Sequence, residues 1–192
     1  MKQLQSSCAS LLVILATLTS TAVRANVTAN QLTNNSNNLT LSGLDPARFE
    51  SNIEGRATHL YTMRNSKGME VCITNFGARI VSVMVPDRKG VMHDVVLGFD
   101  NIAQYADRVN FRSDFGAAIG RYANRINKGQ ITVDGKTIQL PQNNYGHCLH
   151  GGPTGWQYQV YDGRQLNDST LQMTLLSPDG DNNFPGAVTA TV

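Results

Sequence analysis

The sequence predicts an all-β fold in which short antiparallel strands form a sandwich or a barrel. Runs of alternating or β-branched residues recur at short intervals along residues 69–192, with turn-forming residues between them. Asp134 and Gly135 separate two alternating runs, which is the strongest short-range signal for a β-hairpin. A helical pattern is limited to residues 101–107, so the sequence lacks the alternation of strands and helices that is typical of βαβ folds.

The expected strands follow one another to the end of the sequence. Most alternate between apolar and polar residues, as half-buried strands do, and the second ends at a proline turn. The last run still alternates at Val192, where an unpaired strand would leave an exposed edge, so we expect a sheet that is incomplete at the C-terminus. The expected strands are 69–75, 78–87, 94–99, the hairpin 130–140, 158–162, 171–178 and 187–192.

The first residues have the pattern of a secretory signal peptide. Lys2 precedes a short apolar run, and small residues lead to an expected cleavage after Ala25. The run is too short to span a bilayer, and the alternative is a buried N-terminal helix. Residues 26–46 are rich in Asn, Thr and Ser, which predicts a flexible leader. Residues 47–192 are expected to form the folded domain.

Cleavage after Ala25 would balance the charge of the remaining chain. The sequence has 16 Lys and Arg against 14 Asp and Glu, and the signal carries two of the bases, Lys2 and Arg24. A neutral chain argues against nucleic acid or an anionic membrane as a partner, because both require a basic face. No later segment is long and apolar enough to cross a membrane. We expect an exported protein, periplasmic or extracellular, with no membrane partner after cleavage.

Cysteines and histidines offer three chemistries that the sequence does not support well. Cys72 and Cys148 could form a disulfide in an oxidising compartment, but sequence alone does not give the required geometry. His147, Cys148 and His150 suggest a metal, yet a structural zinc site needs four ligands. A Cys148 thiolate would need an orienting partner that the sequence does not identify. Glycine-rich nucleotide motifs are absent, so we expect no metal and no other cofactor.

The segment 115–152 carries the polar residues that best fit a neutral polyol. Arginine donates through a rigid fork, asparagine both donates and accepts, and histidine can do either. Gly151 and Gly152 are expected to let the backbone approach a ligand closely. The alternative for the two arginines is a structural ion pair. The candidate residues are Arg121, Asn124, Arg125 and His150.

Several linked motifs resemble the N-terminal half of the aldose 1-epimerases, or galactose mutarotases. The motifs are TNFGARIVSVMVPDRKGVMHDVVLGFDNIAQY, FGAAIGRYANRINKGQITVDGKTIQLPQNN, LHGGPTGW and SPDGDNNFPG. They cover roughly residues 49–192 in the family's order and spacing. The resemblance implies a large antiparallel β-sandwich that interconverts the α and β anomers of free aldohexoses, such as galactose and glucose, in hexose metabolism.

The resemblance also assigns roles to individual residues. It implies that Asn124, Arg125 and His150 bind the sugar, and that Arg121 is a structural residue. His147 and Cys148 replace a common Asn-Ser pair, and Trp156 stands where Phe is usual. We expect Trp156 to pack in the core, although stacking on a sugar is the alternative.

The family's catalytic acid and base are not found in this sequence. The resemblance places the acid at a histidine after the FPG segment and the base at a glutamate near the C-terminus. No histidine follows His150 and no glutamate follows Glu70. We therefore expect a chain truncated before its catalytic pair and inactive alone. The alternative is a genuine short product that binds carbohydrate without catalysis, and the sequence does not predict an oligomeric state.

Overall fold

The structure is a computed structural model that describes residues 39–192, of which Thr40–Val192 form one compact body. The predicted signal peptide and most of the predicted leader lie outside the described residues. Most elements are antiparallel strands, which confirms the predicted all-β fold. Among the described residues, no helix has the length and apolar character needed to cross a membrane.

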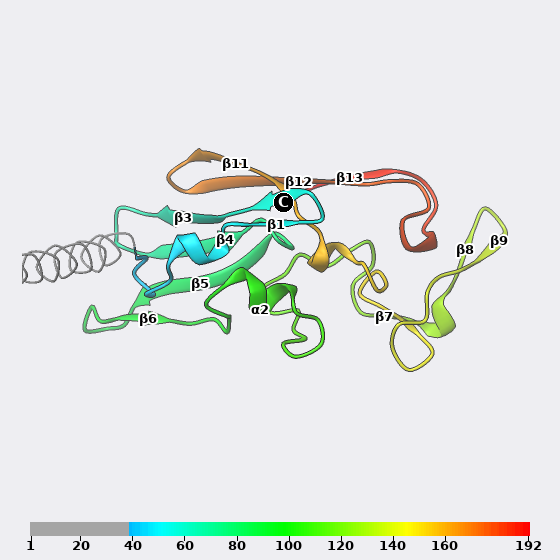
Figure 1. Ribbon diagram of the computed structural model, residues 1–192, viewed down its shortest axis with the longest axis horizontal. Coiled ribbons are helices and arrows are strands. Elements are labelled where there is room, and N and C mark those ends of the chain that lie inside the picture. Colours follow the sequence, from blue (N-terminus) through cyan, green and yellow to red (C-terminus); the bar gives the residue numbers. More distant parts are fainter. Residues whose placement is uncertain (1–38) are drawn as a thin grey trace, which may run out of the picture. The chain divides into compact units, whose positions relative to one another are not determined.

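A four-stranded antiparallel sheet forms the centre of the body (Figure 1). The second strand alternates between buried and half-buried residues, so its Cys72 side chain points into the core. A register shift lies between Cys72 and Ile73 on this strand. In spatial order the strands are β3 (Leu60–Arg64), β4 (Glu70–Thr74), β5 (Arg79–Pro86) and β6 (Met92–Asp94).

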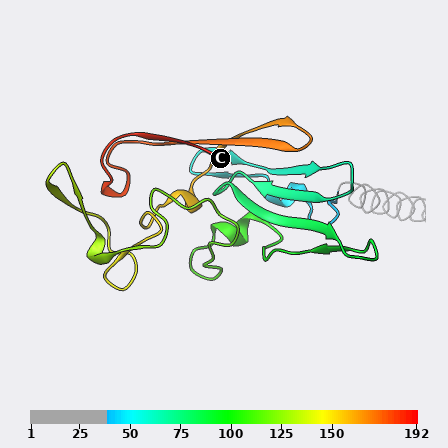
Figure 2. The ribbon, with the colours of Figure 1, turned by 180° about the vertical axis from the view of Figure 1, so that it is seen from behind.

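A three-stranded sheet continues beside the edge strand β3. It consists of β11 (Asp162–Asn167), β12 (Thr170–Ser177) and β13 (Val188–Thr191), in that order. The Tyr61 hydroxyl donates to the Gly163 carbonyl at 3.3 Å, so a side chain joins β3 to β11. Figures 1 and 2 show the two sheets side by side from opposite directions.

Smaller elements surround these sheets. The two-stranded pieces are β1 (Ser51–Ile53) with β2 (Arg56–Thr58), β7 (Arg125–Ile126) with β10 (Cys148–Leu149), and β8 (Gln130–Val133) with β9 (Lys136–Gln139). One short helix, α2 (Ile102–Ala106), begins after Asn101, whose side chain accepts from the Gln104 N–H. The 3₁₀ turns are η1 (Pro46–Phe49), η2 (Asn127–Gly129), η3 (Trp156–Tyr158) and η4 (Asp181–Asn183).

Three apolar clusters fill the body. The largest lies between the four-stranded sheet and α2, where Phe49, Val81 and Tyr105 pack with Cys72. A second holds Tyr161, Met173 and Leu175 under the three-stranded sheet. The third, with Leu140, Cys148 and Phe184, lies beneath β10.

The hairpin and the short helix confirm two sequence predictions. Val133 pairs with Lys136, and Asp134 and Gly135 both take positive φ angles of 49° and 75°. These angles fit the two-residue turn that Asp-Gly favours. The helix spans Ile102–Ala106, within the predicted segment.

Two strand predictions and one boundary are wrong. The strand β6 ends at Asp94, and the Val95 N–H still donates to the Val83 carbonyl at 3.0 Å. Residues 96–99 leave the sheet because the Asp94 carboxylate accepts from the Val83 N–H at 3.0 Å and the Val96 N–H at 3.2 Å. Residues 158–161 make only a single bridge, from Val160 to Phe76, because η3 occupies the start of this segment, and the strand β11 begins only at Asp162. The folded body also begins before residue 47, since Leu44 is buried in the largest cluster.

Candidate functional site

The shortest strand pair of the fold brings the predicted sugar ligands together. In the ladder between β7 and β10, Leu149 pairs with Arg125 and Cys148 pairs with Ile126. Asn124 therefore precedes one strand where His150 follows the other. Asn124, Arg125 and His150 therefore meet at one end of this two-residue ladder, although His150 follows Asn124 by 26 positions in the sequence.

Asn124 and His150 are joined by two reciprocal hydrogen bonds. The His150 N–H donates to the Asn124 carbonyl at 3.0 Å, and the Asn124 N–H donates to Nδ1 of His150 at 2.9 Å. Because Nδ1 accepts this hydrogen bond, the proton of the neutral ring is on Nε2. His150 thus presents an N–H donor at the far side of the ring.

Arg125 keeps most of its donors available. Its Nε donates to the Asn144 side-chain oxygen at 3.0 Å, which orients the guanidinium. Both Nη atoms lack a hydrogen-bond or ion-pair partner among residues 39–192, so the structural ion pair considered from sequence is not formed there. The side chain is exposed, and its outer fork can hold two adjacent oxygen atoms.

Arg121 has the opposite surroundings, as the prediction of a structural role requires. Its five N–H donors all point to atoms of the segment 177–186. Nε donates to the Ser177 hydroxyl at 2.7 Å, and the four Nη bonds run to backbone carbonyls at 2.5–3.1 Å. The acceptor carbonyls belong to Ser177, Pro178, Pro185 and Gly186.

The glycines after His150 serve packing within the protein, which corrects the expected approach to a ligand. A Cβ atom on Gly151 would collide with the backbone of Gly120, and one on Gly152 would lie 2.7 Å from the Asn182 side-chain oxygen. A Cβ atom on Gly120 would in turn collide with the ring of Trp156. Trp156 packs against the second cluster, which confirms its predicted place in the core.

A cavity of about 220 Å³ lies on the other side of His150. Its other walls come from the loop after α2, from η3 and from residues near β10, and Asn124 and Arg125 do not line it. The guanidinium of Arg108 lies 4.6 Å from the centre of the Tyr158 ring in this wall. The other lining residues include Arg112, Asp114, Asn143 and Gln157.

Two buried acceptors in this cavity lack partners among the described residues, namely Asp114 Oδ1 and Gln157 Oε1. Burial, followed by the charge of Asp114, raises the pKa of Tyr158. These residues were not predicted from the sequence. The run of charged residues after the predicted helix was the available signal, but it is also typical of a solvated loop.

Buried Arg79 holds the cavity walls in place. Its Nη1 donates to the Ser113 carbonyl at 3.1 Å, and its Nη2 donates to the Gln157 carbonyl at 2.8 Å. Burial lowers the pKa of this guanidinium, whose carbon lies 4.8 Å from the centre of the Tyr105 ring. One cation therefore ties β5 to both segments that line the cavity beside His150.

The cluster of His147, Cys148 and His150 divides into separate roles. Nδ1 of His147 accepts from the Lys128 N–H at 3.0 Å, so this ring is bound to a different backbone segment from His150. Cys148 is buried below the strand pair, and burial raises its pKa, which disfavours a reactive thiolate. Within residues 39–192, no group of three or more His, Cys, Asp or Glu side chains is arranged to hold a metal ion.

Cys72 and Cys148 are not bonded to one another. Cys72 lies in the largest cluster, and Cys148 lies in the cluster beneath β10. The pairing that sequence left open is therefore resolved in favour of two buried free thiols.

The sequence of this chain matches a known protein family and several of its members. The family model for aldose 1-epimerase matches residues 59–192. The chain is 35% identical over 156 residues to a probable aldose 1-epimerase of Arthroderma benhamiae and 37% identical over 139 residues to an aldose 1-epimerase of Escherichia coli K12. It is 38% identical over 132 residues to a galactose mutarotase of Rattus norvegicus. These matches cover 80%, 72% and 69% of this chain, but only 35%, 39% and 37% of the respective relatives.

Solved structures give the same relationship. A GalM/aldose epimerase homologue from C. elegans superposes with a TM-score of 0.66 at 29% identity, over 71% of this chain and 41% of the other. A galactose 1-epimerase from Lactobacillus acidophilus gives a TM-score of 0.63 at 29% identity, over 73% and 41%. In sequence and in fold, this chain belongs to the aldose 1-epimerase family.

Proposed function

We propose that this chain supplies the sugar-binding part of an aldose 1-epimerase, an isomerase acting on free aldohexoses such as galactose and glucose. The observation that carries the proposal is the meeting of Asn124, Arg125 and His150 at the β7–β10 pair. Their outer polar groups are uncommitted among the described residues, while neighbouring Arg121 is fully used.

Each of the three residues has a distinct part in binding. The Nη fork of Arg125 binds two vicinal hydroxyls, because its two parallel donors match their spacing. The Asn124 amide both donates to and accepts from a neighbouring hydroxyl. His150 donates from Nε2 to a sugar oxygen near the reacting carbon, since the Asn124 N–H holds the ring in that tautomer.

Anomer interconversion needs more than these contacts. An acid must protonate the ring oxygen, and a base must remove the proton from the anomeric hydroxyl. The ring then opens to the aldehyde, the C1–C2 bond rotates, and the chain recloses on the other face of the carbonyl. The family resemblance assigns the acid to a histidine and the base to a glutamate. In this sequence no histidine follows His150 and no glutamate follows Glu70.

We propose that the acid and the base lie in the part of the family sequence that this chain does not match. The chain spans between 35% and 39% of the three relatives named above. The second candidate function is carbohydrate binding without catalysis. Intact mass of the protein from its native source distinguishes the two, because only the first predicts a longer product.

The same mass spectrum tests the proposed export. We propose that residues 1–25 direct the protein to the periplasm or the cell exterior and are then removed. A mature N-terminus at Asn26 supports this proposal, and an intact Met1 in the exported fraction contradicts it.

Measurements of activity and of sugar binding test the proposal that this chain binds the sugar but lacks the catalytic acid and base. We expect the 192-residue chain to leave the anomerisation of fresh α-D-glucose at the buffer rate in polarimetry. A missing acid or base costs about 10²–10⁴-fold each. The chain should still bind D-galactose in an NMR titration, with changes at Asn124, Arg125 and His150. Enzyme-like rates would contradict the missing catalytic pair, and absent changes at these residues would contradict the binding site.

A further inference from the structure

A second cavity lies where β2 and β3 meet the beginning of β11. Its volume is about 320 Å³, near the lower end of the roughly 300–1,000 Å³ typical of small-molecule sites. It shares no lining residue with the cavity beside His150. Its polar lining comes mainly from Arg56, His59, Tyr61, Asn75 and Asp162.

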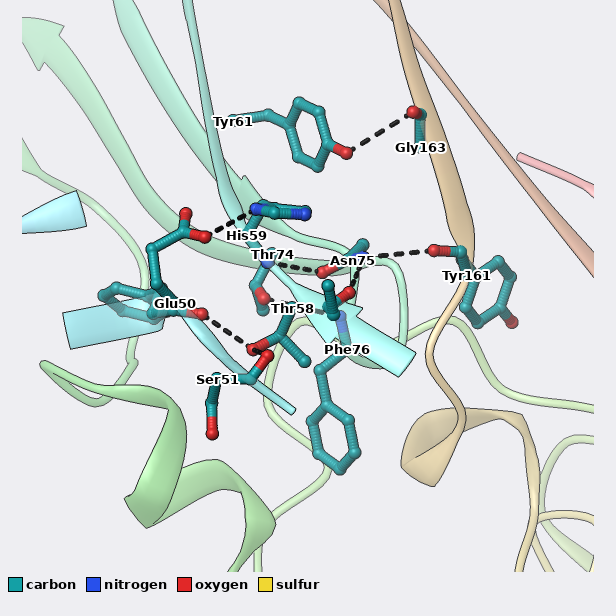
Figure 3. Close-up of polar contacts among 12 residues, drawn as sticks. Glu50, Ser51, Thr58, His59, Tyr61, Thr74, Asn75, Phe76, Tyr161 and Gly163 are labelled. Carbon is teal, nitrogen blue, oxygen red and sulfur yellow. Dashed lines mark hydrogen bonds and ion pairs between the residues drawn. The ribbon is translucent and has the colours of Figure 1, made fainter. Parts of the chain in front are cut away.

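Asn75 builds the floor of this cavity from three chain segments (Figure 3). Its side-chain oxygen accepts from the His59 N–H at 2.8 Å, and its amide nitrogen donates to the Ala57 carbonyl at 3.0 Å and the Tyr161 carbonyl at 3.1 Å. The residue is 3% exposed, so these bonds are shielded from water. The floor is therefore a preformed surface.

His59 stands on this floor with one nitrogen engaged. Its Nδ1 lies 2.7 Å from the Glu50 carboxylate, which can only accept, so Nδ1 carries the proton of the neutral ring. Nε2 is then an acceptor, and no described residue donates to it. Figure 3 shows the ring between Glu50 on one side and the space bounded by Tyr61 and Gly163 on the other. This tautomer is the reverse of the one that Asn124 imposes on His150.

The opposite wall offers a hydroxyl and an ion pair. The Tyr61 hydroxyl donates weakly to the Gly163 carbonyl at 3.3 Å and keeps its lone pairs for a donor. A Cβ atom on Gly163 would lie 2.6 Å from that hydroxyl, so glycine is needed for this approach. Arg56 and Asp162 pair at 2.5 Å on the rim, and both are partly exposed.

The charged side chains around this cavity disfavour an anionic ligand. Arg56 is balanced by Asp162, and Glu50 adds a second carboxylate beside His59. Burial, followed by the charges of Glu50 and Asp162, raises the pKa of Tyr61. A ligand with many hydroxyls and no charge matches a wall that alternates donors and acceptors.

From this arrangement we propose that the cavity between β2, β3 and β11 is a second carbohydrate site, which binds a neutral hexopyranose. A ligand hydroxyl donates to His59 Nε2, another donates to the Tyr61 hydroxyl, and Arg56 donates to a third from the rim. The site stands on its own residues and does not depend on sugar binding at His150.

Methyl β-D-galactopyranoside is a suitable probe because it cannot anomerise. We expect an NMR titration of the whole chain to shift the amides of His59, Tyr61 and Gly163, and to do so equally in the His150→Ala variant. His59→Ala should weaken this response about tenfold, the effect of losing one such hydrogen bond. His93→Ala is the matched control, because His93 is another histidine beside a carboxylate, that of Asp87, and the variant should bind as the wild type does.

Three results would overturn the proposal. The first is the absence of shifts at these amides in a folded wild-type chain. The second is loss of these shifts in His150→Ala, which would place the response at the other cavity. The third is stronger binding of glucose 6-phosphate than of the galactoside, which would show an anion site. Tyr61→Phe provides a second variant, since it keeps the ring and removes only the hydroxyl.

Discussion

Arg121 and Arg125 lie four residues apart in one segment, and the protein uses them in opposite ways. Arg121 gives all five of its donors to the backbone and side chains of residues 177–186. Arg125 gives one donor to Asn144 and keeps its fork exposed. An arginine with every donor satisfied internally has nothing left for a ligand. The number of uncommitted donors therefore separates the structural arginine from the proposed binding arginine better than their shared neighbourhood does.

Replacing Arg121 should have the largest effect in this comparison. Arg121→Ala should lower the free energy of unfolding by about 2–4 kcal/mol, because one side chain links β12 to the turn before β13. Urea denaturation followed by circular dichroism measures the loss. Arg125→Ala is the matched control and should change stability by no more than about 0.5 kcal/mol. Equal losses in both variants would remove the distinction between the two arginines.

Binding should reverse the order of the two arginines. Arg125→Ala should weaken D-galactose binding by about 1–3 kcal/mol, because two sugar hydroxyls lose charged donors. NMR titration of the folded variant gives the change in Kd. Arg88→Ala removes an exposed arginine from a distant turn and should leave Kd as in the wild type. An unchanged Kd in Arg125→Ala would show that the exposed fork does not reach the sugar.

His147 should give the smallest effect. Its ring accepts from the Lys128 N–H at 3.0 Å, so His147→Ala loses one partly exposed hydrogen bond, worth about 1 kcal/mol of unfolding free energy at most. Galactose binding followed at the amides of Asn124 and Arg125 should stay within about twofold of the wild type, whereas His150→Ala should nearly abolish binding at this site. The paired titrations measure this ranking. If His147→Ala weakened binding as strongly, the two histidines would have to act as one site.

Local sequence signals predicted the elements whose geometry is set locally. Asp134-Gly135 determines its own turn, and Asn101 caps the helix that follows it. Residues 96–99 were mispredicted because the Asp94 carboxylate bonds to the distant Val83, which apolar patterning cannot show. Asn124, Arg125 and His150 were chosen through family resemblance, and the structure adds their contact across β7 and β10.

The cavity walls were less accessible to prediction. Asp114 and Gln157 become neighbours because the buried Arg79 binds the segments on which they lie. Arg79 is an unusual core residue, and its partners are backbone carbonyls that have no sequence signature. The second cavity depends in the same way on Asn75, whose single side-chain amide makes hydrogen bonds to residues 57–59 and to Tyr161.

Cys72 and Cys148, the unpaired cysteines of residues 39–192, make local opening of the native protein measurable without any engineered label. Burial, followed by the charge of Glu70, raises the pKa of Cys72 to about 11, and burial raises the pKa of Cys148. At neutral pH neither thiol reacts readily while it is covered, so a thiol reagent modifies each one only when its surroundings open. Cys72 then reports local opening of the four-stranded sheet, and Cys148 reports opening of the short strand pair beside the proposed sugar ligands. The ratio of the two labelling rates gives the relative rigidity of the framework and the binding segment in one experiment.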